Sequence, residues 1–141
     1  AEQTSIEPAS VDLVTAAQAA HWFDHERFNV EVRRVAKPGA VIALWSYGHN
    51  REITPEIDHV VRHFSDEIVG SYWSPEIRHV WEEYRTIPFP FSELAAPNIE
   101  MESELSLDGL IGYLSSWSST TKFIEKTGMN PIEGICNLFG R

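Results

Sequence analysis

The chain has 141 residues, 43% of them hydrophobic, which suits one modest globular domain and argues against a disordered chain. Its formal charge of −10 argues against nucleic-acid binding, since an acidic surface repels phosphates and no basic patch extends beyond Arg33 and Arg34. The longest apolar run, about residues 41–45, is far short of the roughly 20 residues of a membrane span, so we expect a cytoplasmic protein without a membrane partner.

A strand, a helix and a second strand are predicted near the start of the chain. Residues 11–15 form a short apolar run rich in branched side chains, which is typical of a buried strand. Asp24 is a predicted helix N-cap, followed by apolar residues that share one helical face: Phe28, Val32 and Val35. The Lys-Pro-Gly sequence at 37–39 ends this helix near residue 35, and residues 40–45 resume an apolar strand. Because parallel neighbours need a crossover connection, this order predicts an α/β fold with two parallel strands.

The chain after residue 48 is predicted to be mainly helical. The Thr-Pro pair at 54–55 starts an amphipathic helix that ends at Gly70. The Ser-Pro pair at 74–75 repeats this start signal, and the apolar stripe that follows predicts a second, shorter helix as far as Tyr84.

The remaining segments alternate between extended and helical patterns. Two prolines within residues 87–91 allow only an extended edge segment. Residues 99–105 alternate between glutamates and apolar residues, which predicts a half-exposed strand. Helices are expected at about 107–115, 120–127 and 131–139.

Two segments of the first 48 residues, AEQTSIEPASVDLVTAAQAAHWFD and FNVEVRRVAKPGAVIALWSYG, resemble the class I S-adenosylmethionine-dependent methyltransferase family. The likeness is close to its trans-aconitate methyltransferase-like branch. The matching positions are Ala1 and Glu2, Asp12 to Val14, Glu31, Arg34 and Val35, and Lys37 to Gly39. The resemblance implies a partial Rossmann-like core over residues 1–48 and a helical cover or substrate region of the same domain over residues 49–141.

The resemblance also implies which residues contact S-adenosylmethionine. Ala1 and Glu2 match the pair that contacts the adenine. The strand that carries the amino-acid end of the cofactor continues into the remaining predicted cofactor residues: Thr15, Ala16, Ala17 and Gln18.

Catalytic and substrate residues are predicted from the same comparison. His21 and Trp22 match positions just beyond the strand end, where His21 acts as a general base or as pocket wall. The alternative is that both residues only cap the sheet. Three aromatic residues are predicted to line a small-molecule site, with ordinary core packing as the alternative: Tyr47, Trp73 and Trp117.

The family's glycine-rich cofactor turn has no counterpart in this sequence. We therefore expect an incomplete methyltransferase that is inactive alone. If the chain is all there is, the strand at 11–15 leaves an edge unpaired, and we expect a homo-oligomer or a missing N-terminal half that completes the sheet. The alternative is a non-catalytic binding or oligomerisation domain derived from a methyltransferase.

Two further patterns carry simpler interpretations. His59 and His63 lie four residues apart, which suits a metal, but no third and fourth ligand stands in a motif, so no metal is predicted. The single Cys136 is interpreted as a packed, unreactive thiol.

Overall fold

The computed structural model describes residues 1–48, 53–97 and 99–138, the last three without their side chains, so the prediction for the Cys136 thiol lies outside the described residues. The chain divides into two compact units. Unit 1 consists of Ala1–His49 and Pro75–Ala95, and unit 2 of Asn50–Ser74 and Ala96–Arg141. The predicted division into a core over residues 1–48 and a cover of the same domain over residues 49–141 stays a prediction; residues 75–95 belong to the same compact unit as the first segment.

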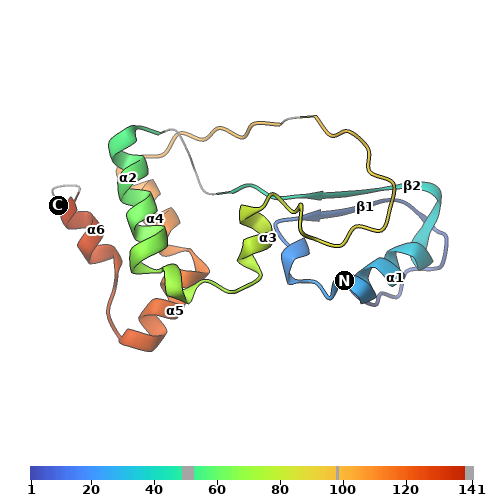
Figure 1. The fold of residues 1–141 in the computed structure, drawn as a ribbon, viewed down its shortest axis with the longest axis horizontal. Helices are drawn as coiled ribbons and strands as arrows, with labels where there is room; N and C mark the ends of the chain where they lie inside the picture. Colours follow the sequence, from blue (N-terminus) through green and yellow to red (C-terminus); the bar gives the residue numbers. More distant parts are fainter. Residues whose placement is uncertain (49–52, 98, 139–141) are drawn as a thin grey trace. The chain divides into compact units, whose positions relative to one another are not determined.

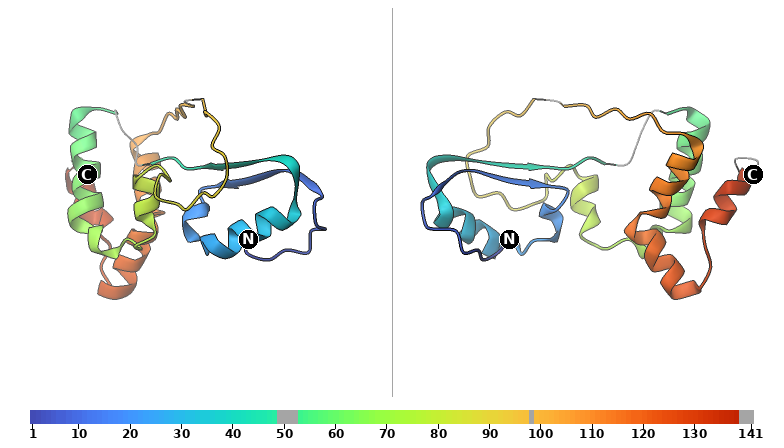
Figure 2. Two further views of the ribbon diagram at one scale, coloured as in Figure 1. Left: turned by 45° about the vertical axis from the view of Figure 1, so that its right-hand side comes forward. Right: turned by 180° about the vertical axis from the view of Figure 1, so that it is seen from behind.

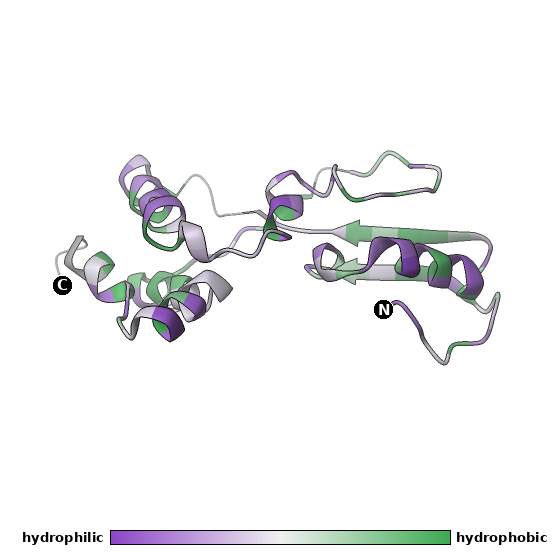
Figure 3. Ribbon diagram, turned by 60° about the horizontal axis from the view of Figure 1, so that its bottom comes forward, coloured by the Kyte–Doolittle hydropathy of each residue, from purple (hydrophilic) through white to green (hydrophobic). Residues whose placement is uncertain are grey.

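Unit 1 begins with the predicted strand, helix and strand. β1 spans Val11–Ala17, α1 spans His25–Val35 and β2 spans Ala36–Trp45, and the strands pair in parallel. Figure 1 shows α1 along one face of both strands. In Figure 3 both strands are largely hydrophobic, whereas α1 alternates, as expected for a helix with one buried side. The α/β class with two parallel strands and a crossover helix is confirmed.

Both ends of α1 follow from local chemistry. Asp24 is the N-cap, as predicted, and its carboxylate accepts a hydrogen bond from the Arg27 N–H at 3.1 Å. The chain leaves α1 directly into β2 at Ala36, not at Ala40, because Ala36 already has an extended backbone and pairs with Val11. The Lys-Pro-Gly sequence is therefore an irregularity within β2, where Gly39 takes a positive φ of 83°.

The second segment of unit 1 contains a shorter helix than predicted. α3 spans Ile77–Trp81 and does not reach Tyr84, because Glu83 and Tyr84 adopt left-handed backbone angles that end a helix. The predicted Ser74 cap is not formed, since Glu76 occupies the N-cap position without a side-chain hydrogen bond.

α1 holds the proline-containing segment that follows α3. The Asn29 amide donates to the Pro88 carbonyl at 3.2 Å, and Arg33 donates to the Pro90 carbonyl at 2.9 Å. The Arg33 guanidinium also lies over the Phe91 ring, 5.0 Å from its centroid. Residues 87–91 form no strand, with bends at residues 87 and 91, so the predicted extended edge segment does not pair with the sheet. The side chains of Asn29 and Arg33 bind two of its carbonyl groups.

Unit 2 is helical. Its elements are α2 (Pro55–His63), a π-helical turn η2 (Phe64–Ile68), a 3₁₀ turn η3 (Gly70–Tyr72), α4 (Leu107–Ser115), α5 (Ser118–Thr127) and α6 (Ile132–Leu138). Figure 2 shows these helices gathered together. Their core consists of Val61, Phe64, Val69, Leu110, Leu114, Trp117, Ile132 and Ile135. No helix in the described part of the chain is long and apolar enough to cross a bilayer.

α2 begins at the predicted Thr-Pro pair, but it ends at His63 and not at Gly70, because the π-helical turn η2 follows it. Thr54 and Ser106 cap α2 and α4 through their hydroxyl groups, and Gly128 ends α5 with a left-handed φ of 70°. The predicted strand at 99–105 is wrong, because no described strand pairs with it and its alternating side chains all remain exposed.

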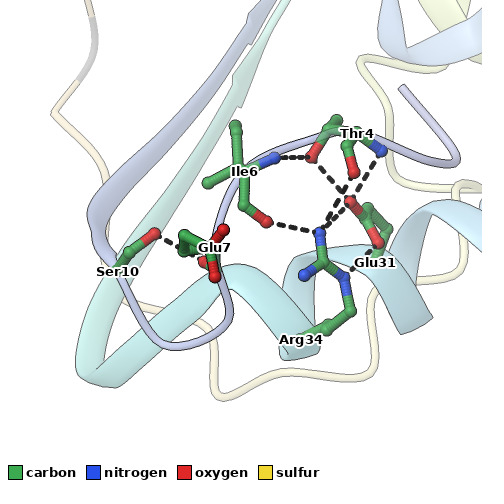
Figure 4. Close-up of polar contacts among 6 residues, drawn as sticks. All are labelled: Thr4, Ile6, Glu7, Ser10, Glu31 and Arg34. Atoms are coloured by element: carbon green, nitrogen blue, oxygen red, sulfur yellow. Dashed lines mark hydrogen bonds and ion pairs between the residues drawn. The ribbon is translucent and has the colours of Figure 1, made fainter.

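A buried carboxylate ties the segment before β1 to α1 (Figure 4). Glu31 accepts hydrogen bonds from the Thr4 N–H at 2.8 Å and the Thr4 hydroxyl at 2.7 Å, and it pairs with Arg34 at 2.8 Å. Arg34 also donates to the Ile6 carbonyl at 2.8 Å. The hydrogen bonds from Arg34 and then from Thr4 lower the pKa of Glu31 to about 2.

We expect Glu31→Gln to lower the thermal stability of the chain at pH 7, because the amide cannot reproduce the charged contacts with Arg34. A lowered pKa stabilises the fold above the ordinary value of 4.5, and this contribution disappears as pH falls towards about 2. Melting followed by circular dichroism from pH 7 to pH 2 should therefore show the difference from wild type narrowing below pH 4.5. A difference that stays constant over this range would contradict the assignment. The exposed Glu100→Gln is the matched control.

Candidate functional site

The carboxyl ends of β1 and β2 meet at one edge of the sheet, where open α/β sheets bind their ligands. The Gln18 N–H donates to the Trp45 carbonyl at 3.1 Å, and its side-chain amide donates to the Tyr47 carbonyl at 2.9 Å. Gln18 has a positive φ of 50°, so the chain turns sharply there. This edge brings together the predicted cofactor residues at 15–18 and the predicted substrate residue Tyr47.

His21 and Trp22 lie on the 3₁₀ turn η1 (Ala20–Trp22), which follows β1 directly. The His21 side chain is 5% exposed and Trp22 is 52% exposed, and their ring centroids are 4.7 Å apart. The two predicted catalytic residues are thus next to the predicted cofactor residues, with one ring buried and the other open to solvent.

His21 contacts a residue that lies far along the sequence. Its Nδ1 is 3.0 Å from the hydroxyl oxygen of Tyr84. Burial lowers the pKa of His21, the nearby His79 lowers it further, and Glu76 opposes the change. Burial also raises the pKa of the Tyr84 phenol, while the backbone N–H groups of His21 and Ala20 oppose that rise.

The predicted adenine-contacting residues lie close to the same end of β1. Glu2 accepts a hydrogen bond from the Asp24 N–H at 3.0 Å, which places it at the start of α1. Ala1, Thr15 and Ala16 line one cavity of about 280 Å³. Its other walls are mainly apolar and include Leu13, Phe23, Phe28 and Val32. Predicted cofactor residues from the start of the chain and from β1 therefore line the same cavity.

The other two predicted substrate residues belong to unit 2. The rings of Trp73 and Trp117 lie with their centroids 5.4 Å apart. Trp117 is only 7% exposed, is part of the core of unit 2 and contacts the rings of Phe64 and Tyr113. Trp117 is thus a core aromatic residue in this structure. Trp73 is half-buried and its indole N–H donates to the Ser65 carbonyl at 3.2 Å.

The histidine pair of α2 has a local partner. His63 Nδ1 lies 3.2 Å from a carboxylate oxygen of Glu67, whereas His59 is exposed. In the part of the chain that the structure describes, no three His, Cys, Asp or Glu side chains gather as metal ligands would.

Tyr84 is the residue of this site that the sequence did not reveal. Its apolar spacing indicates the buried side of a helix, and nothing in the pattern links it to His21, from which 63 positions separate it. The positive φ angles of Glu83 and Tyr84, two successive non-glycine residues, are seen only in the folded backbone and not in the sequence.

Comparisons with known proteins agree with this geometry. A family model described as a methyltransferase domain matches residues 1–44. A Dictyostelium discoideum protein named as a methyltransferase is 35% identical over 127 residues, which are 89% of this chain and 48% of that protein. An uncharacterised methyltransferase of Mycobacterium tuberculosis is 33% identical over 124 residues, covering 84% of this chain and 44% of its own length.

A solved structure from Anaeromyxobacter dehalogenans, described as a type II methyltransferase, is similar to this fold with a TM-score of 0.83 and 48% identity. The match covers 95% of this chain and 57% of that one. The chain spans about half the length of the curated relatives it matches.

Trp117 is buried and Trp22 is half-exposed, so we expect their replacement by alanine to lower the free energy of unfolding by different amounts. We expect Trp117→Ala to lower the free energy of unfolding by about 3–5 kcal/mol, because it empties a packed aromatic site in unit 2. Trp22→Ala, which removes a half-exposed ring, should cost less than about 1.5 kcal/mol. Urea denaturation followed by circular dichroism measures both. Equal costs would contradict the placement of Trp117 in the core.

Proposed function

The chain belongs to the class I S-adenosylmethionine-dependent methyltransferases, and from this we propose that the protein transfers a methyl group from S-adenosylmethionine to a small molecule. The observation that carries the proposal is the meeting of residues 15–18, His21 and Trp22 at the carboxyl edge of the sheet. Placement and orientation of the acceptor can supply most of the catalysis in such a reaction, so no single side chain need be essential.

The residues at the end of β1 suit a bound cofactor. Ala17 is exposed and carries only a methyl group, so a ligand can approach the strand backbone closely. Ala16 and Thr15 border the cavity that Ala1 also lines. We propose that these residues, with Glu2 and Gln18, hold S-adenosylmethionine, which supplies an electrophilic methyl group when bound.

His21 and Trp22 are proposed to face the methyl acceptor. Their position directly after the strand end supports this role. Tyr47, whose carbonyl is bound by Gln18 and whose ring is exposed, is proposed as a further substrate contact. Trp73 and Trp117 remain predictions as substrate residues, and the burial of Trp117 favours a structural role.

Cofactor binding is the first test, measured by isothermal titration calorimetry with S-adenosylmethionine. We expect binding by a fusion that joins, ahead of Ala1, the part of the Anaeromyxobacter dehalogenans protein that lies outside its matched region, and none by this chain alone. The chain alone is not expected to bind because the glycine-rich turn that holds the cofactor in this family has no counterpart in its sequence. Binding by neither protein would favour the non-catalytic alternative, and binding by the chain alone would contradict the need for further residues.

In that fusion, Ala17→Trp should weaken cofactor binding by at least about tenfold, because a large ring would occupy the space beside the strand end. Val30→Trp is the matched control, since Val30 is exposed on α1. An unchanged affinity in Ala17→Trp would exclude the end of β1 from the cofactor site.

We also propose that a further strand pairs with β1, supplied by a longer polypeptide or by a second copy of the chain. Among the described residues β1 pairs with β2 alone, and Leu13 on β1 is 57% exposed. A two-stranded sheet is marginally stable, and an apolar open edge is a template for pairing.

Light scattering distinguishes these sources. We expect the chain alone to self-associate at micromolar concentration, and Leu13→Lys to shift it towards the monomer, because a charge on an edge strand opposes pairing. Val30→Lys on α1 should leave the mass unchanged. If the fusion is a monomer while the chain alone self-associates, the strand that pairs with β1 comes from a longer polypeptide. A chain that is monomeric at all concentrations would contradict pairing between copies.

A further inference from the structure

The rings of three histidines and one tyrosine lie around η1. Neither predicted role of His21, as general base or as pocket wall, requires these contacts. His21 meets the Tyr84 hydroxyl at 3.0 Å, and His25 Nε2 lies 2.9 Å from the Ala20 carbonyl. His25 and His79 form an edge-to-face ring pair with centroids 5.4 Å apart. α3 and the turn after it thus bring a phenol to one particular nitrogen of His21.

We propose that Tyr84 is a positioning residue that holds the neutral His21 ring with its hydrogen on Nε2, so that His21 donates a hydrogen bond to the methyl acceptor instead of removing a proton from it. This inference rests on the proposed function in one respect, since it assumes that an acceptor binds at His21.

The direction of the hydrogen bond follows from the surroundings of the Tyr84 oxygen. The backbone N–H groups of Ala20 and His21 favour negative charge on this oxygen, since they oppose the rise in the pKa of the phenol. A phenol oxygen has about two acceptor positions and one hydrogen to donate. Neither N–H group can accept the phenol hydrogen, whereas His21 Nδ1 lies 3.0 Å away, so the Tyr84 O–H donates to this nitrogen. A neutral imidazole that accepts at Nδ1 carries its hydrogen on Nε2.

The backbone around Tyr84 shows that this placement is specific. Glu83 and Tyr84 both have positive φ values, 54° and 61°, which non-glycine residues rarely adopt in succession. The Tyr84 N–H is bound to the His79 carbonyl at 2.7 Å, and Ile87, which is buried against Ala16 and Ala20, closes the turn through a 3.1 Å bond to the Tyr84 carbonyl. The fold therefore holds the phenol over η1 against its local conformational preference.

The charges near His21 agree with a neutral ring. Burial and His79 lower the pKa of His21 from its ordinary 6.5, and Glu76 opposes this change. His25, on α1, contacts the carbonyl of the same η1 turn. The net direction leaves His21 uncharged at pH 7, the state in which Nδ1 can accept from Tyr84. Within the described part of the chain no hydrogen bond to His21 Nε2 is formed, so this donor is available.

A donor at this position suits an acceptor that enters already deprotonated. The acceptor's lone pair forms the new bond to the methyl carbon, the carbon–sulfur bond breaks, and its electron pair stays on sulfur. No proton has to leave the acceptor in this step, so a general base is not required. A neutral Nε2–H would instead orient a non-reacting oxygen or nitrogen atom of the acceptor.

The test is nuclear magnetic resonance of the whole chain with labelled histidines, using long-range proton–nitrogen correlations. His21→Gln identifies the His21 signals. We expect wild-type His21 to show the Nε2–H tautomer at pH 7.5. Tyr84→Phe should give a mixture of tautomers and a His21 titration at higher pH, because the donor that favours the neutral ring is gone. Tyr113→Phe, a ring in unit 2, should change neither.

Two results would overturn the proposal: an Nδ1–H tautomer in the wild type, or an unchanged tautomer and titration in Tyr84→Phe. The wild-type spectrum decides the first point even if Tyr84→Phe does not fold. These spectra are recorded without cofactor or acceptor. Absence of S-adenosylmethionine binding would therefore contradict the proposed function but would not change the tautomer assigned to His21.

Discussion

The parallel pairing of β1 with β2 is the constraint on which the candidate site depends. Parallel strands must be joined by a crossover, and α1 supplies it between Asp24 and Ala36. The same pairing sends both carboxyl ends to one edge, where Gln18 binds the carbonyls of Trp45 and Tyr47. Residues that lie about thirty positions apart in the chain meet there because the parallel ladder pairs Ala16 with Leu44 and Ala17 with Trp45.

The returning segment at 75–95 completes this edge. α1 holds it through Asn29 and Arg33, which bind carbonyls of the proline-rich stretch, and Ile87 is buried against the end of β1. These contacts bring the Tyr84 phenol over η1. The helical unit has a separate core, in which Trp117 fills space among other aromatic rings. The chemistry proposed for the site therefore depends on the unit that contains the sheet.

Several features were predictable because their causes are local. Asp24, Thr54 and Ser106 cap helices through their own side chains, and apolar spacing marked the buried side of α1. The positions of residues 15–18, His21 and Trp22 next to one another also followed from a strand and the turn after it. Resemblance to the methyltransferases rested on short motifs within the first 48 residues, and the comparisons confirmed it.

By itself, then, the sequence determined the order of strand, helix and strand, most helix ends and the resemblance to the methyltransferases, since these depend on neighbouring residues. Tertiary structure alone decided the rest. Alternation at 99–105 predicted a strand, but a strand exists only where another one pairs with it. Periodicity marked Tyr84 and Trp117 as helix-face aromatics, yet only packing placed one against His21 and the other in a core. Contacts between distant residues arise from the folded backbone, and no local pattern records them.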